Sequence, residues 1–272
     1  MTTSWRTLAR RACPPAYDAM LRWHHRRWLR RETAAGNYVP APARDVHFAG
    51  YQPASDGQRI PRIWHVTWKT ESLPPRFAEV HRTIKALHGS PPWTHTIWTD
   101  SAIEAFVSRH FPQYGEAFAA LPRQIMRVDV FRYMVLFIQG GVYCDLDFRL
   151  FRPIDDMIAD CTLLLPAESD SRKSLTFLAQ HFLAGVPDHP FWADLVRLSL
   201  DKPLETIRRY GDPVMATGPG FVTRVWKSNP ERYRAKIPMR VYFSPPSVLA
   251  KFPAEISPLS IGLHDCTGTW RA

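Results

Sequence analysis

The sequence predicts an α/β fold with a largely parallel sheet, and two observations carry this prediction. Short segments rich in β-branched and aromatic residues alternate with segments of helical periodicity between residues 60 and 148. Such strand–helix–strand order places helices against a sheet whose strands run mostly in one direction. With 272 residues, 45% of them hydrophobic, the chain is long enough and apolar enough to bury a sizeable core.

The expected elements begin and end at recognisable residues. Pro75 suits the first turn of a helix, and glycines at 89 and 140–141 suit helix ends. In chain order we expect a strand at Ile60–Trp68, a helix at 75–88, a strand at Thr96–Thr99, helices at about 101–110 and 123–139, and a strand at Val142–Phe148. The last 35 residues contain five prolines and are expected to be mostly irregular.

The net charge of +10 is concentrated near the N-terminus. Residues 1–32 hold eight arginines and two acidic residues, which leaves only +4 for the remainder. Tyr17, Leu21 and Trp28 fall on one face of an expected helix in this region, and residues 33–58 read as a linker. A basic helix of this kind suits either an anionic membrane surface or packing of its apolar stripe on the body, and both remain open.

Several classes of protein are excluded or disfavoured. The chain lacks a long apolar run for a membrane span and an N-terminal secretory pattern, so we expect a cytoplasmic protein that can be peripheral on the inner face of the membrane. Its four cysteines form no CxxC or zinc spacing and are expected to be reduced. The confined charge and the absence of a nucleic-acid-binding motif argue against nucleic acid as a partner.

The segment Gly140–Asp147 carries the strongest chemical pattern. On a continuous strand Val142, Cys144 and Leu146 would face the core, while Tyr143, Asp145 and Asp147 would share the other face. Two neighbouring carboxylates repel each other unless a cation holds them, and their oxygens suit Mg²⁺ or Mn²⁺. Because Asp-x-Asp is common, a solvated strand face with two incidental acids is the alternative.

The helix before this strand adds a second pair of charged residues. Asp129 and Arg132 are three residues apart, and therefore lie on one helix face. An aspartate there can accept hydrogen bonds from ribose hydroxyls, and an arginine can bind phosphate with two parallel bonds. The alternative is an ordinary surface ion pair, which would contribute little to stability.

The chain also resembles the DXD-containing sugar transferases of family 32, which include yeast outer-chain mannosyltransferases and bacterial surface-polysaccharide transferases. Four ordered segments carry the resemblance: Ile60–Thr70, Ile97–Asp100, Arg127–Tyr133 and Gly140–Asp147. Beyond residue 150 the similarity is looser, at His189–Phe191, Thr217–Pro219 and His264–Trp270. Val128 replaces the usual alanine, and Gln180-His181 stand in a region where the family often has asparagine.

The resemblance implies a GT-A fold over residues 59–272, with a nucleotide-sugar and metal half at about 59–150 and an acceptor half with a C-terminal lid at about 151–272. It assigns catalysis to Asp145, Asp147 and Arg132, and metal binding to Asp145, Asp147 and His264. It assigns nucleobase stacking to Trp68 and closure over the diphosphate to Thr269 and Trp270. The implied donor-binding residues are Trp68, Asp100, Asp129, Arg132, Tyr143, Asp145, Thr269 and Trp270.

The activity implied by the resemblance is a retaining hexosyl transfer that depends on the DXD motif and on Mn²⁺ or Mg²⁺, with Mn²⁺ preferred. A UDP-sugar is the favoured donor and GDP-mannose the second choice. The acceptor would be a glycan or lipid-linked oligosaccharide in bacterial surface polysaccharide or lipopolysaccharide synthesis. An effector-like enzyme that glycosylates a host protein, a basic nucleic-acid-binding module and an inactive sugar-binding or scaffold protein are the alternatives.

Overall fold

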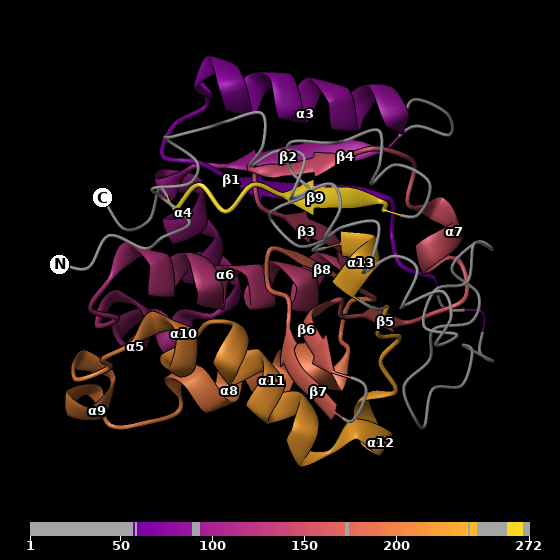
Figure 1. Ribbon diagram of the computed structural model, residues 1–272. Coiled ribbons are helices and arrows are strands. Elements are labelled where there is room, and N and C mark those ends of the chain that lie inside the picture. The colour runs from indigo at the N-terminus through magenta and orange to yellow at the C-terminus, as the bar shows by residue number, and fades with distance from the viewer. Residues whose placement is uncertain are drawn as a thin grey trace, which may run out of the picture.

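The computed structural model describes residues 57, 59–88, 93–171, 174–238, 240–243 and 260–268. Its centre is a five-stranded sheet of order β2-β1-β3-β8-β5 (Figure 1). These strands are β1 Ile63–Thr67, β2 Thr94–Trp98, β3 Gly141–Cys144, β5 Leu163–Leu164 and β8 Phe182–Gly185. β1 pairs in parallel with β2 and β3, whereas β8 is antiparallel to β3 and β5. Four strands therefore share one direction, which confirms the predicted α/β fold with a mostly parallel sheet.

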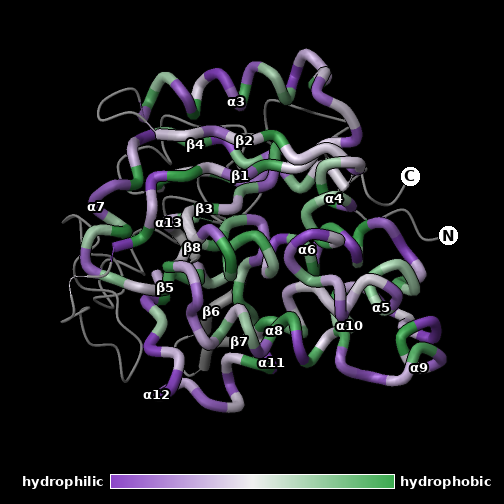
Figure 2. Tube along the Cα trace, turned by 180° about the vertical axis from the view of Figure 1, so that it is seen from behind, coloured by the Kyte–Doolittle hydropathy of each residue, from purple (hydrophilic) through white to green (hydrophobic). Residues whose placement is uncertain are grey.

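Helices cover both faces of this sheet. Helix α3 (Pro75–Leu87) lies on one side, and α6 (Gln124–Gln139), α8 (Pro190–Leu200) and α11 (Pro219–Ser228) lie on the other (Figure 1). Each side has its own buried hydrophobic cluster. Figure 2 shows hydrophobic residues concentrated in the central strands, α6 and α8, whereas the peripheral α9 (Leu204–Arg208) is mixed and α12 (Pro230–Tyr233) is hydrophilic.

The connection from α6 to β3 needs two glycines. Gly140 and Gly141 both have positive φ, +62° and +95°, a conformation that side chains with a Cβ rarely adopt. A Cβ at Gly141 would also lie 2.5 Å from the carbonyl oxygen of Ile63 in the neighbouring β1. The Gly-Gly pair thus ends α6 and lets β3 enter the sheet directly beside β1.

Two further strand pairs lie outside the central sheet. β4 (Phe148–Leu150) pairs antiparallel with β9 (Gly262–His264), and this pairing brings the C-terminal segment onto the residues that follow β3. β6 (Ala167–Ser171) and β7 (Ser174–Leu178) form a separate two-stranded sheet. The remaining elements are α4 Asp100–His110, a 3₁₀ turn at Pro112–Tyr114, α5 Gly115–Ala119, α7 Asp155–Ile158, α10 Pro213–Ala216 and α13 Arg240–Phe243.

Most predicted elements between residues 60 and 141 are confirmed, with ends shifted by one to three residues. The predicted continuous strand Val142–Phe148 is wrong. β3 ends at Cys144, and the chain turns at Leu146 and Asp147 before β4 begins. The Phe148 N–H closes this turn by donating to the Asp145 carbonyl at 3.0 Å. Asp145 and Asp147 therefore project from a turn, and not from one face of a strand.

Other predictions meet the structure only in part. The helix at residues 17–28 and nearly all of the linker at 33–58 lie outside the described residues. Of the described residues after 238, Arg240–Phe243 is helical and Gly262–His264 forms a strand, and residues 244–259 and 269–272 lie outside the described part of the chain, so the prediction for them is not tested. Cys144, Cys161 and Cys266 are free thiols, and no helix in the described part of the chain is long and apolar enough to span a membrane.

Candidate functional site

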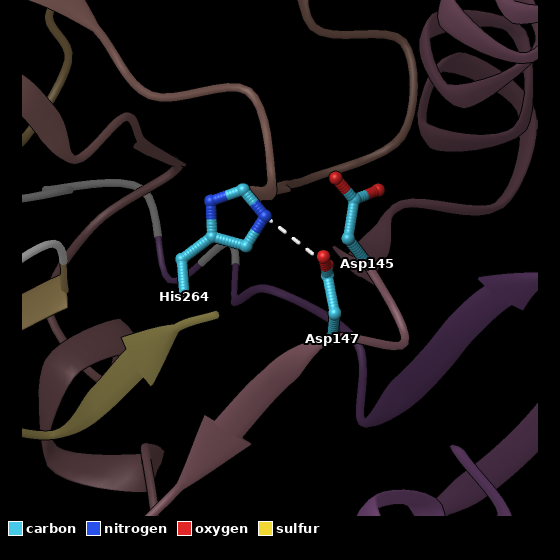
Figure 3. Close-up of side chains that lie close together, drawn as sticks. All are labelled: Asp145, Asp147 and His264. Carbon is cyan, nitrogen blue, oxygen red and sulfur yellow. Dashed lines mark hydrogen bonds and ion pairs between the residues drawn. The ribbon is translucent and has the colours of Figure 1, made fainter. Parts of the chain in front are cut away.

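Three potential metal ligands converge where the C-terminal segment meets the turn after β3. Asp145 and Asp147 project from this turn, and His264 projects from the end of β9 (Figure 3). One ligand atom from each lies within 4.8 Å of the other two. The His264 Nε2 is 3.1 Å from the Asp147 Oδ1. Strand pairing explains this meeting, because Phe148 of β4 is paired with His264 of β9.

Thr267 is a fourth residue of this cluster, and the sequence prediction missed it. Its backbone N–H and its hydroxyl both donate to the Asp147 Oδ2, at 2.9 and 2.7 Å. The Asp265 N–H adds a bond of 2.9 Å to the Asp147 carbonyl. Its position three residues after His264 could have indicated this role, but the resemblance to the family assigned Thr269 instead. These bonds fix the Asp147 carboxylate in one orientation.

Without metal, Asp147 is ionised and His264 carries a proton that it would have to release to bind a metal. Burial alone would raise the pKa of Asp147, but hydrogen bonds from His264 and Thr267 hold it well below its usual range. Burial alone would lower the pKa of His264, but its bonds to Asp147 and Cys266 and the nearby carboxylates raise it to about 11. The two carboxylates and one imidazole are the hard oxygen and borderline nitrogen donors that Mn²⁺ and Mg²⁺ accept. The residues present therefore fit a divalent metal.

Asp129 and Arg132 form a buried ion pair next to this cluster. The Arg132 Nη2 lies 3.2 Å from the Asp129 Oδ1, and both side chains are at most 4% exposed. Arg132 also donates to the Gln180 carbonyl at 2.7 Å and lies 3.5 Å from Asp145. The Thr217 hydroxyl donates to the other Asp129 oxygen at 2.8 Å. The alternative of an ordinary surface ion pair is therefore wrong.

Burial dominates the protonation of this pair. It raises the pKa of Asp129 to about 6, although Arg132 and Thr217 stabilise the carboxylate. Burial alone would lower the pKa of Arg132, but the surrounding tyrosines and carboxylates raise it. Arg132 therefore stays charged, and it connects Asp129 to Asp145 through one guanidinium.

The other predicted donor-binding residues differ in accessibility. Tyr143 is fully buried, with its hydroxyl 2.8 Å from the Thr67 Oγ1 and the Arg132 guanidinium 4.5 Å from its ring centroid. Trp68 is partly exposed and packs edge-on against Phe77. Asp100 is also partly exposed and accepts from the Gln124 side chain at 3.2 Å. Thr269 and Trp270 lie outside the described residues.

Strand direction nevertheless brings three of these residues to one edge of the sheet. Trp68 follows β1, Asp100 follows β2 and Asp145 follows β3, and these strands are mutually parallel. Their carboxyl ends meet at the same edge, where ligands of open α/β sheets usually bind. Trp68 and Asp100 thus lie at the same edge of the sheet as the cluster of Asp145, Asp147 and His264, while the binding roles assigned to individual residues remain predictions.

Comparisons with known proteins find similarity to glycosyltransferases. Residues 74–164 match the family model described as a glycosyltransferase sugar-binding region containing a DXD motif. The inositol phosphoceramide mannosyltransferase 1 of Schizosaccharomyces pombe is 27% identical over 167 residues, which cover 61% of this chain and 51% of the relative. The mannosyl phosphorylinositol ceramide synthase CSH1 of Saccharomyces cerevisiae is 29% identical over 173 residues, covering 64% and 44%.

The chain spans about half the length of these curated relatives. Among solved structures, the PaToxG glycosyltransferase aligns with a TM-score of 0.49 and 16% identity, over 66% of this chain and 71% of that chain. The matched segment contains the turn with Asp145 and Asp147, the buried Asp129–Arg132 pair and Asp100. The resemblance to the DXD-containing glycosyltransferases is thereby confirmed, with residues 74–164 matching the model of their sugar-binding region.

Proposed function

We propose that this protein is a metal-dependent glycosyltransferase that moves a sugar from a nucleotide-sugar donor to a glycan or glycolipid acceptor. The observation that carries the proposal is the convergence of Asp145, Asp147 and His264 at the carboxyl edge of the sheet, inside or beside the matched sugar-binding region. This arrangement supports a divalent cation next to an anionic donor. The proposed domain spans residues 59–272, with the basic segment 1–58 as an appended arm.

The protein's own residues would divide the work around the donor. Asp145, Asp147 and His264 would hold the metal, which supplies positive charge to the departing diphosphate. Thr267 would keep the Asp147 carboxylate aimed at it, given the two hydrogen bonds between them. Arg132, whose guanidinium lies 3.5 Å from Asp145, would fix that carboxylate and add a permanent positive charge beside the cluster. Trp68, at the open end of β1, would stack on the nucleobase.

We further propose that the transfer retains the anomeric configuration. Asp145 and Asp147 would be engaged with the metal, and Asp129 is buried in its ion pair, so none of these carboxylates is placed to attack the sugar. A same-face reaction, in which the leaving diphosphate accepts the proton of the acceptor hydroxyl, requires no such nucleophile. The anomeric configuration of the product, read by NMR, would test this step.

Mannose is the first sugar to test, because the two curated relatives described above are named for mannosyl transfer. The base is open between guanosine and uridine, since an indole ring can stack on either. Donors can be ranked by thermal stabilisation in Mn²⁺, because a ligand at about 100 times its Kd stabilises the native state by roughly 2.7 kcal/mol. Stabilisation followed by sugar release would support an enzyme, and stabilisation without turnover would indicate a sugar-binding protein.

The acceptor we propose is a membrane lipid carrying a polar or glycan headgroup. The relatives are named for action on inositol phosphoceramide, and the basic arm would bring the protein to anionic lipids at about 1 kcal/mol per well-placed charge. Deletion of residues 1–44 should reduce co-sedimentation with phosphatidylserine vesicles and spare hydrolysis of the free donor. Vesicle binding equal to that of the full chain would contradict the membrane role.

A further inference from the structure

We propose that His181 is a positioning residue that holds the His264 imidazole in the orientation needed to bind metal. The inference rests on the proposed metal function of His264 and assigns the task to a residue outside the three-ligand cluster. His181 lies directly before β8, far in sequence from both the DXD turn and β9. Its side chain is buried.

The ring geometry is the first observation. The His181 and His264 rings are stacked, with centroids 4.2 Å apart and planes inclined by 21°. His181 is also stacked on Phe148, at 5.2 Å and 26°. Since Phe148 and His264 are cross-strand partners in β4 and β9, His181 packs against both strands of the pair that delivers the ligand. The His264 ring therefore lies against a rigid, buried aromatic surface.

The anchoring of His181 is the second observation. Its carbonyl accepts the Asp145 N–H at 2.8 Å, and the carbonyl of the preceding Gln180 accepts from Arg132 at 2.7 Å. The Nδ1 of its ring lies 3.4 Å from the Glu168 Oε2. The segment Gln180-His181 therefore makes two kinds of contact. Its main-chain carbonyls bind Asp145 and Arg132, and the His181 side chain contacts His264. The same segment was recognised in the sequence only as a departure from the family pattern.

The position of His264 shows why such support matters. Only the three residues of β9 pair with β4, so the ligand is carried by a short strand. The Cys266 Sγ lies 3.3 Å from the Nδ1, whereas the Nε2 points to Asp147. Rotation of the ring by 180° about the Cβ–Cγ bond would place Cε1 where the Nε2 lies and Cδ2 where the Nδ1 lies, so that no ring nitrogen would face Asp147. Stacking on His181 opposes this rotation, in the manner of the outer contacts that orient metal-binding histidines.

The test compares His181→Ala, which removes the ring, with His181→Phe, which keeps an aromatic face. His189→Ala is a matched control, because His189 is another buried histidine, and it caps α8 by accepting the Phe191 N–H. Mn²⁺ affinity is measured by calorimetry on the full chain without nucleotide. The ring-current shift of the His264 side-chain protons, assigned with a His264→Gln variant, is measured by NMR without metal.

We expect His181→Ala to weaken Mn²⁺ binding about 10- to 100-fold, as for other outer-contact substitutions, and to abolish the His264 ring-current shift. His181→Phe should stay within about threefold of the wild type, because the stacking surface remains. His189→Ala should lower the melting temperature without changing either readout.

Wild-type Mn²⁺ affinity in folded His181→Ala, or equal losses in the alanine and phenylalanine variants, would overturn the inference. Failure of the wild type itself to bind Mn²⁺ would instead remove the proposed metal function. The NMR measurement still decides the contact in that case, since an unchanged His264 shift in His181→Ala would refute the stacking on its own.

Discussion

The buried pair Asp129–Arg132 and the open cluster Asp145, Asp147 and His264 lie side by side but are built differently. The side chains of the pair are at most 4% exposed, whereas those of Asp147 and His264 are 13% and 19% exposed and that of Asp145 is 30% exposed. The pair carries one charge of each sign, with Thr217 donating to Asp129 and Arg132 donating to the Gln180 carbonyl, while the Arg132 Nε has no hydrogen-bond partner. The cluster brings two carboxylates together at the edge of the sheet.

From this difference we expect the buried pair mainly to support the fold and the open cluster to take part in the chemistry. A buried ion pair whose charges are balanced internally holds the helix α6 against the DXD turn. A partly open cluster with an excess of carboxylate can exchange its internal partners for a cation. The comparison therefore predicts that substitutions in the pair will act mainly on stability, and substitutions in the cluster mainly on metal binding and turnover.

Arg132→Met should produce the largest loss of stability. Removing one partner of a buried pair leaves an uncompensated charge, so we expect the free energy of unfolding to fall by about 3–5 kcal/mol. The loss should be greater at pH 8 than at pH 5, because the lone Asp129 carboxyl must ionise as the pH rises. Urea unfolding of Arg132→Met and of Asp129→Asn/Arg132→Met measures both effects. The double variant should recover part of the loss, and a single-variant loss below about 1 kcal/mol would contradict the role assigned to the pair.

His65 extends the comparison to a buried group that is neutral. Its Nε2 lies 2.9 Å from the Gly140 carbonyl and its Nδ1 accepts from the Trp98 indole at 3.1 Å, so the Nε2 carries the proton. Burial lowers the pKa of His65 to about 4, despite the opposing bond to Gly140. A second proton on the Nδ1 would face the Trp98 N–H, which disfavours the charged ring in the folded protein.

The sign of the resulting pH dependence follows from this pKa. The unfolded chain, with a histidine pKa near 6.5, binds more protons than the native state between about pH 6.5 and 4. Stability is therefore complete above pH 6.5 and falls as the pH drops toward 4, by up to roughly 3 kcal/mol from this residue. Urea midpoints for the wild type and His65→Gln at pH 7, 5.5 and 4.5 should show a shallower fall in the variant. Parallel curves would argue against His65 as the source.

Thr267→Val should have a smaller effect, confined to the open cluster. It removes one of the two bonds that orient Asp147 and leaves the backbone bond in place. Because a hydrogen bond to a charged group contributes about 1.5–3 kcal/mol, and this one is partly exposed, we expect about a tenfold loss of Mn²⁺ affinity. Thr267→Ser keeps the hydroxyl and serves as the control. Equal affinities in the valine and serine variants would show that the backbone bond alone orients Asp147.

The sequence predicted much of the first half of the fold because local signals and tertiary packing agree there. The glycines at 140 and 141 ended α6 as expected, and the parallel strands β1, β2 and β3 followed from hydrophobic pattern. The turn after β3 was not predicted because polar and apolar residues alternate over Asp145–Phe148, as they do in a strand. The hydrogen bond from the Phe148 N–H that closes the turn does not alter this alternation. The position of β8 in the sheet depends on its antiparallel pairing with β3. Local sequence patterns do not predict such a long-range pairing.

The sequence predicted the three potential metal ligands but not the residues that support them. Asp145, Asp147 and His264 were identified by motif resemblance, and the structure brings all three together. The contributions of Thr267 and His181 depend on the β4–β9 pairing, which joins residues more than a hundred positions apart. A residue whose role is to hold another side chain carries no chemical signature of its own in the sequence.

The central claim, that the open cluster binds the metal for sugar transfer, is tested most directly by Asp147→Asn. Sugar release from the preferred donor should require Mn²⁺, stop with EDTA and return when Mn²⁺ is restored. In Asp147→Asn the rate should fall at least about 100-fold, with a smaller loss of melting temperature than in Arg132→Met. Asp156→Asn, an exposed carboxylate in α7, is the control and should match the wild type. An Asp147→Asn rate within about threefold of the wild type, with the same Mn²⁺ dependence, would contradict the account.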